Sequence, residues 1–172
     1  MQSHVPSTTT LSPSADVALV IEDAAGRQLA RFNVHAETLK RKSRYFHALL
    51  GRNFDEGRRL QEAGYGSVVL KEDDPTIMWI ILSLLHDHEV DIDFGTSMDG
   101  KLDRLFWIAV HCDKYDCNAA LRGHIARWSR LVQDATWTND IGLRLTIAYL
   151  LHTQEWLQSL SDRVMTEFRP NF

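Results

Sequence analysis

The most constraining feature of the sequence is the run at residues 76–85, in which nearly every side chain is apolar. The run follows Asp73, Asp74 and Pro75. An acidic cap followed by proline at the first helical position is a strong signal for the start of a helix. Apolar side chains would lie all round this helix, so it has no face suited to water. The run therefore predicts a buried central helix that the rest of the chain must surround.

Strand patterns dominate the first half of the chain, and helical patterns dominate the second half. Alternating or β-branched residues predict strands at 17–22, 29–34, 67–71 and 90–94. Apolar residues three and four positions apart predict helices at 36–50 (two short helices, the second capped by Ser43), 76–85, 101–115, 118–132, 139–151 and 154–168. The polar segment 51–66 is predicted to be a loop. This order favours an α+β fold in which helices cap a small sheet.

Composition narrows the classes of function. Hydrophobic residues make up 44% of the 172 residues, enough for a core, whereas the Ser-, Thr- and Pro-rich residues 1–15 predict a disordered tail. The net charge of −4 argues against binding nucleic acid. Cys112 and Cys117 are too few for a disulfide scaffold. With no signal-peptide pattern and no apolar run near the ~20 residues of a membrane span, we expect a cytoplasmic or nuclear protein without membrane association.

Several short motifs occur in order along residues 16–132. They are Asp16-Val17, Phe32-Asn33-Val34-His35, Leu39, Ser43-Arg44-Tyr45-Phe46, Val69-Leu70-Lys71-Glu72-Asp73-Asp74-Pro75, Ala109, Asp113-Lys114-Tyr115-Asp116 and Leu121. Together they resemble the signature of the BTB/POZ domain, and the D-K-Y-D form is similar to BTB proteins of filamentous fungi. The resemblance implies a BTB/POZ fold over residues 16–133, with a small β-sheet flanked by helical hairpins, and a C-terminal helical extension over residues 134–172. It also implies a non-catalytic interaction module that forms a homo-oligomer or recruits protein partners.

The chain departs from the members of this family that dimerise by strand exchange. Those members carry an additional helix and strand before the Asp16 position, and residues 1–15 lack the apolar pattern for them. Their charged pocket has an acidic residue, matched by Asp16, and a basic residue that Ala36 replaces. His86 stands where an aromatic residue usually ends the buried helix. The resemblance therefore does not extend to the exchanged dimer.

Phe54, Asp55 and Glu56 form the candidate partner-binding site. They stand before the third strand, where BTB adaptors of cullin ubiquitin ligases carry a hydrophobic-x-Glu motif. The resemblance implies that the aromatic side chain docks in a pocket of the cullin and that the carboxylate fixes the neighbouring backbone. One exposed aromatic side chain can carry much of the binding energy of an interface. The alternative interpretation is that Phe54 covers the domain's own core.

Three aromatic residues of the terminal helices are candidates for an oligomer interface, and these are Trp137, Trp156 and Phe168. They line either such an interface or the packing surface of the last helix pair, because an amphipathic helix must bury its apolar stripe. In the family, a helix pair after the core domain enlarges the surface that meets the cullin. The extension therefore fits an adaptor as well.

The chain offers little for catalysis or for a cofactor. Asp93-Phe94-Gly95 spells the kinase magnesium motif, but the partner motifs of a kinase are missing. His111, Cys112, Cys117 and His124 lack the paired spacing of a zinc site, so we expect neither metal nor cofactor. The basic residues 40–44 are interpreted as a solvated helix face.

Three classes of function remain open. The first is a BTB/POZ module, in one version an adaptor for a cullin-type ubiquitin ligase. The second is a transcription-linked or scaffolding oligomer that binds no ligase. The third and most remote is a small metal-dependent enzyme or ligand binder that uses the His and Cys residues.

Overall fold

The computed structural model describes residues 8–95, 97–133 and 140–167 as an α+β protein. Its strands form one four-stranded mixed sheet in the order β1-β3-β2-β4. The strands are β1 (Thr8–Thr10), β2 (Val17–Glu22), β3 (Gln28–Val34) and β4 (Gly66–Lys71). β2 and β3 are antiparallel, whereas β1 pairs with β3 and β4 pairs with β2 in parallel. The predicted α+β class, the hairpin and the third strand are confirmed.

The N-terminal segment differs from the predicted tail. Residues 1–7 lie outside the described residues, but residues 8–10 form β1 along the outer edge of β3. Leu11 is buried, and the Nε2 atom of His88 lies 2.8 Å from its carbonyl oxygen. The prediction of a disordered tail is therefore wrong for residues 8–15. Backbone hydrogen bonds to β3 need no apolar pattern in β1, and within residues 8–15 only Leu11 enters the core.

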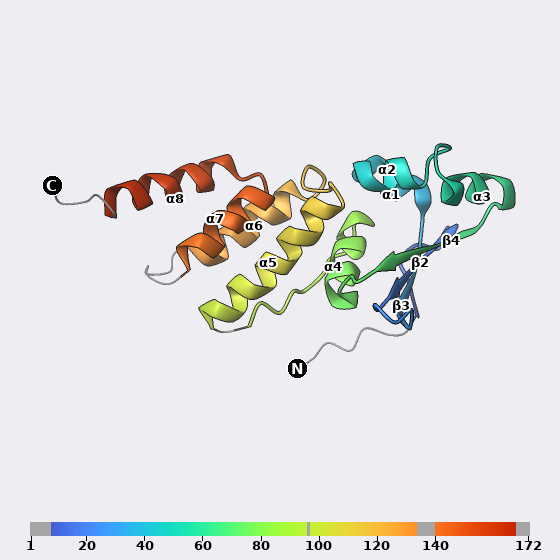
Figure 1. The fold of residues 1–172 in the computed structure, drawn as a ribbon, viewed down its shortest axis with the longest axis horizontal. Coiled ribbons are helices and arrows are strands. Elements are labelled where there is room, and N and C mark those ends of the chain that lie inside the picture. Colours follow the sequence, from blue (N-terminus) through green and yellow to red (C-terminus); the bar gives the residue numbers. More distant parts are fainter. Residues whose placement is uncertain (1–7, 96, 134–139, 168–172) are drawn as a thin grey trace.

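The helices are α1 (Ala36–Lys42), α2 (Arg44–Leu49), α3 (Asp55–Ala63), α4 (Pro75–Leu85), α5 (Met98–Lys114), α6 (Arg122–Gln133), α7 (Ile141–Leu150) and α8 (Gln154–Glu167). Figure 1 shows helices α1–α3 above the sheet, with α4 next to it and the remaining helices beyond α4. Figure 1 places α4 between the sheet with α1–α3 on one side and the helices α5–α8 on the other. The Ser43 side chain accepts a hydrogen bond from the Phe46 N–H, which confirms the predicted break and cap between α1 and α2.

The predicted central helix is confirmed as α4. The Asp74 carboxylate caps it by accepting hydrogen bonds from the N–H groups of Thr76 and Ile77, and Pro75 follows at the first helical position. Met78, Ile81, Leu82 and Leu85 have no exposed surface. α4 therefore occupies the middle of the core.

Two predicted elements are wrong. Residues 55–63, predicted as part of a loop, form α3, which buries the single apolar side chain Leu60. Residues 90–94, predicted as a strand, have no regular structure. Val90 is buried and Ile92 and Phe94 pack against the core, so their apolar alternation reflects packing without strand pairing.

Candidate functional site

Phe54 lies immediately before α3 and is displayed to solvent. It is the N-cap residue with an extended backbone, and 48% of its surface is exposed. Its carbonyl oxygen accepts a hydrogen bond from the Arg58 N–H at 3.1 Å, which closes the first helical turn. Phe54 belongs neither to the core nor to the side chains packed against it. About half of the surface of Phe54 is therefore accessible to a partner, and both interpretations of this residue stay predictions.

Asp55 and Glu56 occupy the first turn of α3. Carboxylates at this end interact favourably with the partial positive charge of the helix N-terminus. Asp55 also pairs with Arg58, whereas Glu56 is half-buried. The three predicted site residues thus form one continuous surface segment at the start of a helix.

A close backbone contact fixes the start of α3. Gly57 faces the carbonyl group of Gly51, and a Cβ atom at position 57 would lie 1.8 Å from that oxygen. At the other end of the helix, Gly64 adopts φ +71° and donates to the Leu60 carbonyl at 2.9 Å. This left-handed glycine cap is a common helix ending. α3 therefore presents Phe54 from a defined position.

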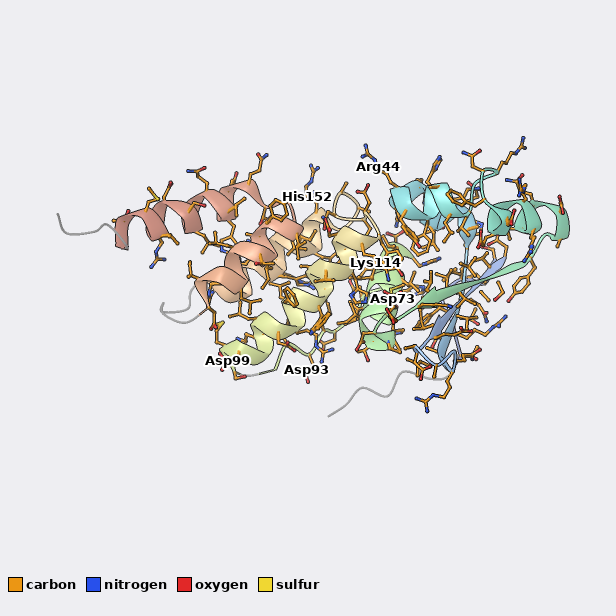
Figure 2. All side chains as sticks on the ribbon, viewed as in Figure 1. Arg44, Asp73, Asp93, Asp99, Lys114 and His152 are labelled. Carbon is orange, nitrogen blue, oxygen red and sulfur yellow. The ribbon has the colours of Figure 1, made fainter. Side chains whose placement is uncertain are left out.

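A buried carboxylate joins the β4–α4 connection to the end of α5. The Asp73 side chain accepts hydrogen bonds from the Lys114 Nζ atom at 2.7 Å and from the Tyr115 hydroxyl at 2.6 Å. Figure 2 shows Asp73 and Lys114 side by side in the middle of the molecule. Burial, followed by the hydrogen bond to Asp73, raises the pKa of Tyr115 well above its ordinary value. The hydroxyl therefore remains a donor throughout the physiological range.

Tyr115 also connects to the helix pair α1–α2. The Ser43 hydroxyl donates to the Tyr115 carbonyl at 2.5 Å, and the Phe46 and Tyr115 rings stack with centroids 5.1 Å apart. Tyr45 contacts both rings edge-on. Segments from three parts of the chain therefore meet at Tyr115.

A second junction lies at the corner between β3 and α1. The Asp16 carboxylate accepts a hydrogen bond from the Ala36 N–H at 2.7 Å, and the His86 Nε2 atom accepts one from the His35 N–H at 3.2 Å. The His86 Nδ1 atom lies 2.8 Å from the Leu82 carbonyl oxygen and must carry the proton. Burial lowers the pKa of His86, which favours this neutral form.

Trp156 has only 6% of its surface exposed and belongs to the core. This burial agrees with the alternative interpretation, in which Trp156 packs inside the chain. Trp137 and Phe168, the other two residues predicted for an oligomer interface, lie outside the described residues.

The two cysteines lie next to each other in the core. The Cys117 thiol donates to the Cys112 carbonyl at 3.7 Å, and interaction with Cys117 together with burial raises the pKa of the Cys112 thiol. A thiol held protonated is a poor metal ligand. Within residues 8–95, 97–133 and 140–167, His, Cys, Asp and Glu side chains form no group of three or more that could hold a metal ion.

Two further sequence motifs have local partners. The Asp93 carboxylate accepts a hydrogen bond from the Gly95 N–H at 2.8 Å within its own turn. In the basic segment, Lys40 pairs with Glu37, and Lys42 pairs with Asp87 at 2.7 Å. Neighbouring carboxylates thus compensate part of that positive charge.

The contact of Asp73 with Lys114 and Tyr115 could not be predicted from the sequence, although all three residues belong to the short motifs of residues 16–132. Their spacing along the chain carries no sign of the contact.

In the part of the chain that the structure describes, no helix has the length and apolar character needed to cross a membrane. Neither a scan against protein-family models nor a search of curated proteins finds a match to this chain.

Proposed function

We propose that this chain is a non-catalytic protein–protein interaction module of the BTB/POZ type. It self-associates and recruits partners, and the segment Phe54, Asp55 and Glu56 binds a cullin scaffold. The observation that carries the proposal is the half-exposed Phe54 ring at the ordered start of α3.

The contacts among the motif residues support the BTB/POZ assignment. Asp16 bonds to the Ala36 backbone, Ser43 bonds to Tyr115, and Asp73 bonds to Lys114 and Tyr115. Each of these contacts joins segments that are distant in the sequence. Residues that recur together in a signature are expected to meet in this way when they stabilise a shared architecture.

The physical role of Phe54 follows from the exposure of its ring and from the helix start that holds its backbone. Moving a half-exposed aromatic ring into a partner's pocket removes apolar surface from water, which favours binding by roughly 25 cal/mol per Å². The helix start already holds the backbone, so little conformational entropy is lost on binding. Glu56, half-buried beside it, is available to accept hydrogen bonds from the partner's backbone.

A binding measurement with the N-terminal domain of a cullin tests this function. We expect Phe54→Ala together with Glu56→Ala to weaken binding by at least about 30-fold, because anchors of this kind contribute roughly 2 kcal/mol or more. Val69→Ala is the matched control, since Val69 is 47% exposed on the edge strand β4 and should bind like the wild type. Isothermal titration calorimetry gives the affinities, and circular dichroism verifies the fold.

Two results would contradict the cullin assignment. One is equal affinity of the wild type and the double variant, and the other is a wild type that does not bind at micromolar concentration. Light scattering on the same samples tests the broader proposal, that the chain is an interaction module, separately from cullin binding. Self-association without cullin binding would favour a scaffolding oligomer, whereas a monomer without any partner would overturn the interaction module.

A further inference from the structure

A groove of about 580 Å³ lies where the β2–β3 turn, the β4–α4 connection and α5 come together. We call it the acidic groove. The residues that line it include Leu29, Glu72, Asp73, Asp103, Trp107 and His111. None of these residues belongs to the Phe54 segment.

Carboxylates dominate the charge of the acidic groove. Five acidic residues and one arginine, Arg104, are among the lining residues. Lys114 neutralises Asp73, Arg27 pairs with Asp23, and Asp74 is occupied in capping α4. Glu72 and Asp103 are exposed, and neither side chain has a hydrogen bond or ion pair among the described residues. The groove therefore keeps two carboxylates that are available to a cationic ligand.

Large apolar side chains border these carboxylates. Trp107 is 46% exposed on α5, and Leu29 is 45% exposed on β3. The face of an indole ring attracts cations more strongly than any other aromatic side chain. A ligand with a cationic group next to an apolar one would match both the charge and the surface of the groove.

His111 lies at the buried wall of the groove. Its side chain is 6% exposed, and its Nδ1 atom lies 2.9 Å from the Trp107 carbonyl oxygen, so Nδ1 carries a proton. The Nε2 atom makes no hydrogen bond within the described residues and lies 3.4 Å from the Asp73 Oδ1 atom. The two exposed carboxylates, Glu72 and Asp103, favour a ligand that presents several N–H donors. A guanidinium group has five such donors and always carries a positive charge.

We infer that the acidic groove binds an arginine side chain in an exposed segment of a partner protein. The guanidinium group lies over Trp107 between Glu72 and Asp103, and a neighbouring apolar residue of the partner contacts Leu29. This site goes beyond the proposed cullin-binding segment and does not depend on it. Its negative charge repels phosphate, so nucleic acid is not the expected occupant.

A fluorescein-labelled synthetic peptide, Arg-Leu-Arg flanked by Gly-Ser pairs, is the probe. Fluorescence anisotropy in 150 mM NaCl measures its affinity, since this salt screens weak surface attraction. A second peptide with citrulline in place of both arginines keeps the shape and removes the charge. We expect the full chain to bind the arginine peptide about tenfold more tightly than the citrulline peptide.

The variant Glu72→Gln with Asp103→Asn removes both available carboxylates without changing side-chain size. We expect it to weaken binding of the arginine peptide about tenfold. The matched control is Glu62→Gln with Glu89→Gln, which changes the net charge equally. Glu62 is exposed on α3, and Glu89 is exposed beyond the far end of α4. The control variant should bind like the wild type.

Nuclear magnetic resonance locates the bound peptide. The indole N–H signal of Trp107, assigned with Trp107→Phe, should shift on addition of the arginine peptide. Phe54→Ala should leave peptide binding unchanged, so failure of the cullin proposal and failure of this one can be distinguished. Equal binding of both peptides, equal losses in both double variants, or an unmoved Trp107 signal would each overturn the inference.

Discussion

Single polar side chains join distant segments of this chain. Asp16 bonds to the first residue of α1, Asp73 bonds to the end of α5, and His86 bonds to the corner between β3 and α1. A buried polar group that loses its partner costs about 1–3 kcal/mol. Loss of any one of these three side chains should therefore lower the free energy of unfolding.

His86 should make the stability of the protein depend on pH. Burial lowers the pKa of His86 in the folded state, and His88, Lys42 and His35 add positive charge nearby. As the pH falls below about 6.5, the ordinary pKa of histidine, the unfolded chain therefore takes up the proton first. The stabilisation is present above that pH and is lost as the pH falls through the lower, folded-state value.

Urea unfolding at pH 7.5 and pH 5.5 checks this expectation. The wild type should lose more free energy of unfolding between these pH values than His86→Gln, whose side chain does not titrate. His47→Gln is the control, because His47 is exposed on α2 and should leave the pH dependence unchanged. Parallel pH profiles for the wild type and His86→Gln would contradict the role of His86.

At the scale of elements, α3 depends on one close backbone contact. The Gly57 backbone approaches the Gly51 carbonyl so closely that no side chain fits between them. The contact joins the end of α2 to the start of α3. This junction therefore determines where α3 begins and where it places Phe54.

Gly57→Ala should distort the start of α3. We expect a loss of roughly 1–3 kcal/mol in the free energy of unfolding, as for other overpacked sites, because the opposing atoms are backbone. Gly142→Ala is the control, since a Cβ atom there meets nothing within 4 Å and alanine favours the helix α7. Chemical denaturation of both variants gives the comparison. Equal stability of Gly57→Ala and the wild type would contradict the proposed contact.

Strong local patterns explain which elements could be predicted from the sequence. α4 has its Asp–Pro start and an apolar surface all round, and β2 and β3 have alternating residues around a polar turn. α3 contains only Leu60 as an apolar anchor, so its composition resembles that of a loop. β1 forms through backbone pairing with β3, which its sequence does not encode locally.

The candidate sites show the same difference between local and long-range patterns. Phe54, Asp55 and Glu56 are consecutive, so they could be predicted from the sequence as one site. The acidic groove combines Leu29, Glu72 and Trp107 from separate elements, and only the folded chain brings them together. Such a site has no local pattern from which to predict it.

At the scale of the molecule, the C-terminal helices complete the core. α7 packs on α5, and α8 packs on α7. Ile147, Ala148 and Leu151 are almost fully buried, and the Asn118 side chain donates to the Leu150 carbonyl at 2.8 Å. The helices after residue 134 are therefore joined to the preceding part by a shared core.

A chain that ends at residue 133 should be markedly less stable than the full chain. Exposing the α5 surface that α7 covers and losing the burial of Ile147 and Leu151 should cost roughly 3–6 kcal/mol. A chain that ends at residue 161 is the control, because it keeps the buried Leu160 and removes the 73% exposed Met165. Calorimetry should show a much lower Tm for the first truncation and a small change for the second. Unchanged Tm in both would contradict the shared core.

The grip of Asp73 on α5 has a mechanical consequence. Its two oxygens accept hydrogen bonds from consecutive residues at the helix end, Lys114 and Tyr115. A force on the end of α5 can therefore reach the residues after β4 through side-chain hydrogen bonds as well as along the backbone.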